Sequence, residues 1–506
     1  MNMKKIAEKI LALSAKDEKS IRQEALLCSG DVKIYSESIH KLDNAVLFLG
    51  RNEEERFLLI VSAGNMPEGF EGEKMAIQGG AMLKCKLDGV NGKALRKYFP
   101  WTAPVSLRKE RTTVGCGDRL GLATVGHLLA ARKYKVSPVL AQQSLRELTM
   151  TKRTFQELVD CAGFMVFQMD YKDGYGADGD HLKKIPDMDV ALEAGMPMIT
   201  LDLSDVMNAA AGDWEEAAVE EAFAKLPCDS QKRIAELYAD KTFAVPGAEV
   251  ALDALTAKRC AVMYDAALDF AFEVYEHLKS KRGDEFDLEI SIDETSSPTL
   301  PSHHLYIASE LVRRGIQFSS LAPRFIGEFQ KAIDYIGDLD EFDRQFKVHA
   351  AIAKAYGNYK VSVHSGSDKF AVYPTIGRET AGYLHLKTAG TSWLVAVEVI
   401  AKCDPALYRD MHKCAQESFN DMLKLYHITA DITKIPALES LTDAQLPSLM
   451  EMPEARQMLH ITYGPILTSG LRERFFKAMH KFEDEYSKAL EKHFDKHLSL
   501  LGAPLK

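Results

Sequence analysis

The feature that most constrains the fold is a repeated alternation of short apolar segments with helical segments between residues 111 and 395. Eight segments have the apolar or alternating pattern of β-strands, and most are followed by a helical stretch, several of which end in glycine. Strand–helix units in series are typical of a parallel sheet. Eight units favour a (β/α)8 barrel, with an open doubly wound sheet as the alternative. The predicted strands are 112–121, 136–144, 163–170, 197–205, 286–295, 316–323, 359–368 and 383–390.

Three further segments accompany the predicted barrel. Residues 1–110 are expected to form a small α+β unit, because two apolar segments flank the polar turn RNEE between residues 45 and 65. Residues 206–282, between the fourth and fifth predicted strands, form an oversized helical insertion. Residues 396–506 contain long amphipathic stretches and are expected to be a helical extension. The chain is thus predicted to be α/β, with a TIM-type barrel over 111–395 and an added unit at each end.

The composition excludes several classes of protein. The net charge is −10 and there is no long basic run, so nucleic-acid binding has no electrostatic support. No run of about 18 apolar residues is available to span a membrane, and the charged N-terminal segment lacks the apolar core of a signal peptide. The eight cysteines include no C-x-x-C pair, which favours a reducing compartment over a disulfide framework. We therefore expect a cytoplasmic protein that acts on a small molecule, with an oligomer possible through the C-terminal helices.

Residues 174–181, GYGADGDH, contain the glycine spacing of a dinucleotide-binding loop. Such a loop needs its glycines directly between a strand and a helix, whereas residues 171–173 intervene here and two acidic residues crowd the motif. Negative charge beside a pyrophosphate is unfavourable, so a nucleotide site is disfavoured. A flexible surface loop is one alternative. We interpret the motif as a loop whose small residues let the backbone approach a ligand and present Asp180 and His181.

Polar side chains collect where the predicted strands end. In a (β/α)8 barrel the carboxyl ends of the strands converge on one mouth, where the active sites of this fold lie. Each such residue could instead be a turn former or a helix cap. Cationic groups there would suit an acidic substrate, because arginine binds a carboxylate with two hydrogen bonds, although Lys387 could alternatively form a Schiff base. The substrate-binding candidates are Asp118, Arg119, Gln143, Arg324 and Lys387.

Histidines near two strand ends are candidate metal ligands. His181 and His364 could bind Zn²⁺, Mn²⁺, Fe²⁺ or Ni²⁺, because imidazole together with carboxylates is a common ligand set for these ions. Each could also be a hydrogen-bonded structural residue. His304, at the start of the helix after the fifth strand, could reach the mouth or simply begin that helix. Glu328, after the sixth strand, could be a ligand or an exposed glutamate favoured by the helix dipole.

A pair of carboxylates ends the alternating fifth strand, LEISIDET. Alternation directs either Asp293 or Glu294 into the barrel and the other outward. An inward carboxylate opposite Asp180 would form an acid/base pair of the kind that proton-transfer enzymes use. The alternative is an ion pair with an inward arginine or lysine.

Six long motifs lie between residues 117 and 394: GDRLGLAT (117–124), AQQSLRELT (141–149), GYGADGDHLK (174–183), SLAPRFIGEFQKAIDYIGD (320–338), HSGSDKFAVYP (364–374) and LHLKTAGTSWL (384–394). They resemble motifs of the tagaturonate/fructuronate epimerase family. The resemblance extends over about residues 110–395 and implies a metal-dependent isomerase that interconverts D-tagaturonate and D-fructuronate.

The resemblance also implies roles for particular residues. A base next to a metal-binding histidine matches Asp180 followed by His181. A second acid/base matches Glu294 best, with Asp293 or Glu289 as alternatives. His364 fits a further metal ligand. Two residues compete for the remaining ligand position, Glu328 and His304.

The implied reaction limits the mechanisms that the enzyme could use. The two keto-uronates differ at a carbon β to the ketone, whose hydrogen is not acidified by the carbonyl. Retro-aldol cleavage with a Lewis-acidic metal and two carboxylates fits this requirement, whereas transient oxidation needs a tightly held nicotinamide. The competing hypotheses are a metal-dependent aldolase, an epimerase of a neutral or phosphorylated ketose, and a non-catalytic sugar-acid binding protein.

Overall fold

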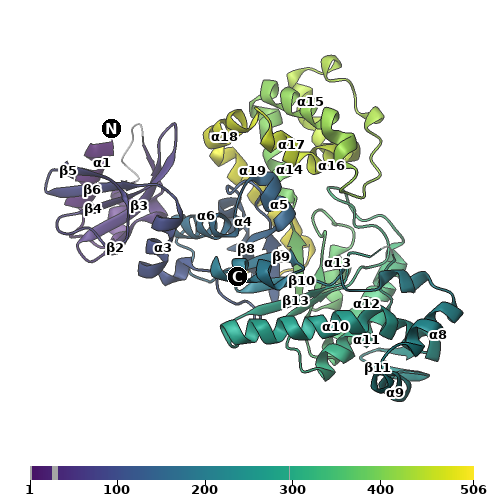
Figure 1. The fold of residues 1–506 in the computed structure, drawn as a ribbon. Coiled ribbons are helices and arrows are strands. Elements are labelled where there is room, and N and C mark those ends of the chain that lie inside the picture. Colours follow the sequence, from purple (N-terminus) through teal and green to yellow (C-terminus); the bar gives the residue numbers. More distant parts are fainter. Residues whose placement is uncertain (1–2, 26–31, 296) are drawn as a thin grey trace.

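Eight parallel strands form a closed barrel in the computed structural model, which describes residues 3–25, 32–295 and 297–506 (Figure 1). Each strand pairs in parallel with both neighbours, which confirms the barrel and excludes the open sheet. The strand residues are almost all buried, because helices cover the outside and side chains fill the inside. In ring order the strands are β10 (Met198–Asp202), β13 (Asp287–Ser291), β14 (Ser320–Ala322), β15 (Lys360–Val363), β16 (Leu384–Thr388), β7 (Thr112–Cys116), β8 (Ser137–Ser144) and β9 (Gly176–Leu182).

Helices follow the barrel strands along the chain. Six of these helices begin one to ten residues after a barrel strand ends, so their N-termini lie on the same side of the barrel as the carboxyl ends of the strands. These helices are α4 (Thr124–Ala131), α5 (Leu145–Thr151), α6 (Phe155–Gln168), α7 (Ile185–Glu193), α10 (Ala254–Arg282), α11 (Pro301–Arg313), α12 (Leu339–Ala355), α13 (Tyr373–Glu379) and α14 (Thr391–Cys403).

One predicted strand is wrong. Residues 163–170 lie largely in α6, which begins with a capping box between Thr154 and Glu157. The barrel contacts α6 on one side and the N-terminal unit contacts it on the other, so most of its residues are buried. A helix that is buried all round presents a continuous apolar run, which periodicity alone cannot distinguish from a buried strand.

The third barrel strand is instead the glycine-rich segment itself, β9. A Cβ atom at Gly179 would lie 2.9 Å from Cδ1 of Leu182 and 3.0 Å from Cβ of Ala191 on α7. The prediction that this segment is a loop is therefore wrong: Gly179 allows close packing of a strand against a helix. Because side chains alternate along a strand, Asp178 and Asp180 share its inner face.

The N-terminal unit contains an antiparallel sheet that lies to one side of the barrel (Figure 1). It contacts α6 and the turn that follows it through ion pairs, such as Arg96 with Asp160 in α6 at 2.6 Å and Arg22 with Asp170 in the turn at 2.8 Å. The following segment crosses the amino ends of the strands, where Asp287 accepts a hydrogen bond from the Leu107 amide at 2.8 Å. The elements are α1 (Met3–Ala12), α2 (Glu18–Ala25), β1 (Lys33–Ile34), β2 (His40–Leu42), β3 (Ala45–Arg51), β4 (Arg56–Ser62), β5 (Gly72–Ile77), β6 (Gly80–Cys85) and α3 (Gly89–Tyr98).

The insertion between β10 and β13 is not purely helical. It contains α8 (Glu216–Ala224), α9 (Cys228–Leu237) and an antiparallel hairpin of β11 (Lys241–Val245) and β12 (Ala248–Leu252) before α10. The hairpin turns at Gly247, whose φ of +78° favours glycine.

The C-terminal extension is helical and extends over the barrel. Its last helix packs along α4, where a Cβ atom at Gly126 would lie 2.8 Å from Cβ of Leu490. None of the helices in the described part of the chain is long and apolar enough to cross a membrane. The elements are α15 (Pro405–Met422), α16 (Pro453–Ile461), α17 (Tyr463–Thr468), α18 (Arg472–Lys481) and α19 (Glu483–Leu500).

Candidate active site

A β-bulge turns two consecutive residues of β9 toward the barrel mouth. Gly179 pairs with Ile199 and Leu182 pairs with Leu201, so β9 contains one more residue than β10 between these pairs. His181 adopts the left-handed backbone conformation, with φ +53°. A bulge of this kind re-aims a side chain that alternation would direct outward. Asp180 and His181 consequently both line the mouth cavity.

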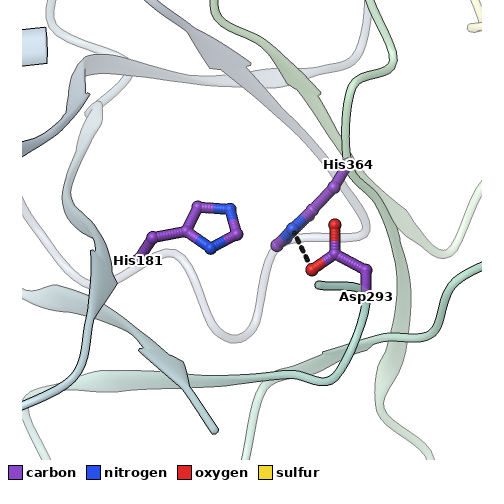
Figure 2. Close-up of side chains that lie close together, drawn as sticks. All are labelled: His181, Asp293 and His364. Atoms are coloured by element: carbon purple, nitrogen blue, oxygen red, sulfur yellow. Dashed lines mark hydrogen bonds and ion pairs between the residues drawn. The ribbon is translucent and has the colours of Figure 1, made fainter. Parts of the chain in front are cut away.

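Three possible metal ligands converge in this cavity (Figure 2). Ligand atoms of His181, Asp293 and His364 all lie within 4.8 Å of one another. The imidazole centroids of the two histidines are 4.8 Å apart, and His364 Nδ1 lies 3.0 Å from Asp293 Oδ1. The residues come from the carboxyl ends of β9, β13 and β15, which the barrel brings together. Two imidazoles and a carboxylate are a donor set that suits a divalent cation such as Zn²⁺, Mn²⁺, Fe²⁺ or Ni²⁺.

Each of these histidines also contacts a second, deeper carboxylate. His181 Nδ1 lies 3.4 Å from Asp202 Oδ2, and His364 Nε2 lies 2.7 Å from Glu289 Oε1. Carboxylates commonly orient metal-binding histidines in this way. Burial opposes the charged form of His364, but Asp293 and Glu289 outweigh it and raise its pKa to about 10. The carboxylates thus stabilise positive charge at this position. A metal cation would supply that charge in place of the histidine protons.

Lys387 occupies the centre of the barrel beneath this cluster. Its ammonium lies 2.6 Å from Asp180, 2.9 Å from Glu289 and 3.0 Å from Asp178. Burial opposes its charge, but these carboxylates outweigh it and hold the pKa of Lys387 well above its ordinary value. A protonated amine is not a nucleophile, so the geometry disfavours the Schiff-base alternative. Burial likewise opposes ionisation of Asp180, but Lys387 lowers its pKa to about 2.

The other predicted ligands and the second acid/base are located differently. Glu294 is exposed at the rim and lines the cavity. Glu328 lies in an adjoining outer hollow, 3.4 Å from His427. His304 is buried in α11 outside the mouth, where its nitrogens lie 2.8 Å from His349 and 2.6 Å from Tyr359. The structure therefore brings Asp293, rather than Glu328 or His304, to His181 and His364.

Only some of the predicted substrate-binding residues line the mouth cavity. Asp118 accepts hydrogen bonds from the backbone of its own loop, the nearest at 2.8 Å, and does not line the cavity. Arg119 lines the cavity but donates two hydrogen bonds to Glu147, at 2.7 and 2.9 Å. Arg324 lines the outer hollow and donates to the Thr295 carbonyl. In β8 the cavity is lined by Gln142 and not by the buried Gln143.

The mouth cavity has a volume of about 280 Å³, which suits a small polar molecule. The cluster of carboxylates and histidines lines part of it. Lys331 and Arg146 also line the cavity, together with Tyr426 and His460 from the C-terminal extension. The extension, rather than the N-terminal unit, therefore encloses the mouth.

A second group of possible ligands lies outside the mouth. Asp368 contacts His493 at 2.6 Å and His497 at 3.4 Å on α19, but Arg456 of α16 binds its other oxygen at 2.7 Å. The Asp368 amide also donates to His497 Nε2 at 3.2 Å. Since these contacts already satisfy the cluster, it is a structural tie between the loop after β15 and two helices of the extension.

The barrel with histidines and carboxylates gathered at the carboxyl ends of its strands defines a (β/α)8-barrel enzyme site. A sequence profile described as tagaturonate epimerase matches residues 35–501. The tagaturonate/fructuronate epimerase of Thermotoga maritima is 39% identical over 472 residues, which cover 93% of this chain and 97% of that protein. The chain belongs to the tagaturonate epimerase family and is an isomerase.

Solved structures agree with this assignment. A glycerol complex of the fructuronate-tagaturonate epimerase from Cohnella laeviribosi matches with a TM-score of 0.91 and 41% identity, covering 97% of this chain and all of that chain (100%). The native structure of the same enzyme also matches with a TM-score of 0.91 and 41% identity, covering 97% and 99%. The resemblance inferred from the six motifs is thereby confirmed, as is the barrel class.

Sequence reasoning missed three carboxylates of the site or ranked them too low. Asp178 and Glu289 are fully buried beside Lys387, and Asp202 is buried against His181. The signal for Asp178 was its two-residue spacing from Asp180, which is informative only once GADGDHL is recognised as a strand. The same alternation places Glu289 and Asp293 on one face.

Proposed function

We propose that this isomerase interconverts D-tagaturonate and D-fructuronate with the help of a divalent cation held by His181, Asp293 and His364. The observation that carries the proposal is the convergence of these three ligands beside Asp180 in a cavity of about 280 Å³. The names of the related enzymes support the substrate pair. We also propose a cytoplasmic location, in keeping with the free thiols of the seven described cysteines.

The reaction that fits these residues is retro-aldol cleavage followed by aldol addition. A base removes the proton of the hydroxyl group on the β carbon, and the bond between the α and β carbons breaks. The β carbon becomes an aldehyde, and the electron pair of the broken bond enters the enediolate formed with the ketone. The aldehyde turns its other face, the bond forms again, and the new alkoxide takes up a proton. No atom is gained or lost.

Inversion at the β carbon requires proton transfer on two sides. We assign Asp180 to one side, because it is ionised and reaches the cavity from the inner wall. Glu294, at the rim of the same cavity, is the candidate for the other side. Lys387 holds Asp180 in place at 2.6 Å. His181, Asp293 and His364 would hold a divalent cation, which would supply Lewis acidity to stabilise the developing negative charge on the substrate oxygens.

Transient oxidation by a nicotinamide is the less favoured route. Two of the three glycines that would cradle its pyrophosphate, Gly176 and Gly179, belong to β9, and Gly179 is in close contact with side chains of the barrel wall. They do not lie between a strand and a helix, as a dinucleotide-binding loop requires.

The proposed function is tested with protein that has been stripped of metal by a chelator and then supplied with single divalent metals. Conversion of D-tagaturonate to D-fructuronate is followed by NMR. We expect no conversion in the stripped protein and recovery with at least one metal. Release of three-carbon fragments during turnover would point to an aldolase. A metal-loaded protein that ignores D-tagaturonate but epimerises D-tagatose or a phosphorylated ketose would overturn the substrate assignment.

A further inference from the structure

The cations around the mouth differ in whether a carboxylate neutralises them. Arg119 pairs with Glu147, and Lys387 pairs with three buried carboxylates. Lys331 and Arg146 have no carboxylate oxygen within 4.0 Å among the residues that the structure describes. Lys331 donates to the Ser365 hydroxyl, at 2.7 Å, and Arg146 lies over the ring of Tyr426. Both of these unpaired cations line the mouth cavity.

Two buried neutral side chains line this cavity without a hydrogen-bond partner in the described structure. His460 is 2% exposed and Gln142 is 1% exposed, yet neither ring nitrogen of His460 and neither amide atom of Gln142 has a partner. Buried polar atoms are rarely left unpaired, because they have lost their water without a replacement. Their position in the cavity wall indicates that a polar ligand completes their hydrogen bonds.

The position of His460 depends on a glycine. A Cβ atom at Gly390 would lie 1.8 Å from Cε1 of His460, so any other residue would displace the imidazole. Gly390 directly precedes α14, and it lines the cavity together with Ala389. The positive end of the α14 dipole therefore adds to the field of Lys331 on this side of the cavity.

The mouth thus contains groups of both kinds. Asp180, Asp202 and Asp293 suit a cation, whereas Lys331, Arg146 and His460 supply hydrogen-bond donors for an anion. We infer that Lys331, Arg146 and His460 form a subsite for the carboxylate of the substrate, with Lys331 as the principal determinant of acidic over neutral ketoses. This inference rests on the proposed function, because it assigns the acid end of the same substrate. Carboxylate is favoured there since a charged acceptor binds these donors more strongly than a neutral hydroxymethyl group does.

The test compares ligands that differ only at the acid end. Binding and epimerisation of D-tagaturonate and D-tagatose are measured for the wild type and for Lys331→Met, with isothermal titration calorimetry and NMR. We expect K331M to raise Kd and KM for D-tagaturonate at least about tenfold, and to leave both values for D-tagatose within about twofold. Lys331→Arg should recover part of the loss, because it restores the charge.

Two further variants separate a local effect at the subsite from a general loss of charge or of folding. Lys424→Met removes an exposed cation that pairs with Asp421 outside the cavity, so it should leave the discrimination unchanged. Arg146→Met changes an exposed side chain, so it should fold even if K331M does not. We expect it to weaken D-tagaturonate more than D-tagatose, with a smaller effect than K331M.

The inference is overturned if K331M and R146M weaken both ligands equally, or neither. Tighter binding of D-tagatose 6-phosphate than of D-tagaturonate, lost in K331M, would also overturn it in favour of a phosphate subsite. A wild type that binds D-tagaturonate but does not epimerise it would contradict the proposed function alone. In that case, the effect of K331M on the Kd of D-tagaturonate, compared with its effect on the Kd of D-tagatose, would still test the carboxylate subsite.

Discussion

At the scale of single residues, the site depends on ionised carboxylates that lie close to cationic side chains. Asp180 remains charged in a buried position because the Lys387 ammonium lies 2.6 Å away. His181 and His364 are each fixed by a deeper carboxylate on one side and face the cluster on the other. The roles of Asp180 and Asp202 can be tested separately, because only one of them belongs to the proposed acid/base pair.

Asp180→Asn should abolish epimerisation and leave the metal bound. The amide cannot accept the hydroxyl proton, whereas the proposed ligands His181, Asp293 and His364 are unchanged. Steady-state kinetics by NMR and metal analysis after dialysis measure the two properties separately. A variant that retains more than about a tenth of the wild-type kcat would exclude Asp180 as the base, since general-base catalysis contributes at least about a hundredfold.

Asp202→Asn should weaken metal binding about 10- to 100-fold without removing a proposed ligand, because Asp202 orients His181 from 3.4 Å. Competition with a fluorescent chelator measures the affinity. Asp205→Asn is the matched control, since Asp205 lies three residues further along, just past β10, and pairs with Lys183, at 2.6 Å, instead of with His181. Equal affinities for wild type and D202N would show that the Asp202 contact does not orient a ligand.

At the scale of elements, β9 and α6 each adopt a secondary structure that their local sequences do not suggest. β9 is GADGDHL, with two glycines and two aspartates, a composition typical of a turn. It is a strand because the barrel supplies backbone partners on both edges and Lys387 neutralises its inward carboxylates. GFMVF is apolar enough for a strand, yet it lies within a helix between the barrel and the N-terminal unit. In both elements tertiary contacts override local propensity.

Gly179→Ala should destabilise the protein by about 1–3 kcal/mol, because a Cβ atom would lie within 3.0 Å of Leu182 and Ala191. Thermal unfolding measures the change in Tm. Gly64→Ala is a suitable control, since its Cβ atom would meet nothing closer than 3.9 Å. Equal Tm values for the two variants would mean that β9 has room that the structure does not indicate.

At the scale of the whole molecule, burial of histidines governs the response to acid. Burial lowers the pKa of nine of the fifteen histidines, to about 4 for His40 and about 3 for His349, for example. Unfolded histidines titrate near 6.5, so between about pH 6.5 and 4 the unfolded state binds more protons than the folded state. The nine are His40, His127, His303, His304, His349, His385, His412, His460 and His497.

The metal-free protein should therefore lose stability as the pH falls below about 6.5, by up to about 1.4 kcal/mol per pH unit for each of these histidines within its window. His181 and His364 act in the opposite sense, because their raised pKa values favour the folded state at low pH. The nine histidines with lowered pKa values outnumber these two. Calorimetric Tm values between pH 7.5 and 4.5 check the sign. A Tm that stays constant or rises on acidification would contradict the buried, neutral state of these side chains.

The sequence by itself determined the fold class and the family. Strand–helix periodicity is a local property of the chain, and seven of the eight predicted strands overlap barrel strands. The adjacency of Asp180 and His181 and the position of His364 at a strand end were likewise readable from the sequence. Glu328 and His304 were plausible ligands by residue type, but no local pattern tells which side of a wall a side chain faces.

Only the tertiary structure decided how the mouth is composed. The β-bulge in β9 arises from pairing with β10, so no spacing in the sequence reveals that Asp180 and His181 both face the cavity. Asp293 meets His364 because ring closure brings β13 and β15 to the same rim, although the two residues are 71 positions apart. Lys331 and His460 line the same cavity because the C-terminal extension folds over the barrel. Contacts between distant segments depend on the geometry of barrel closure, which local periodicity does not contain.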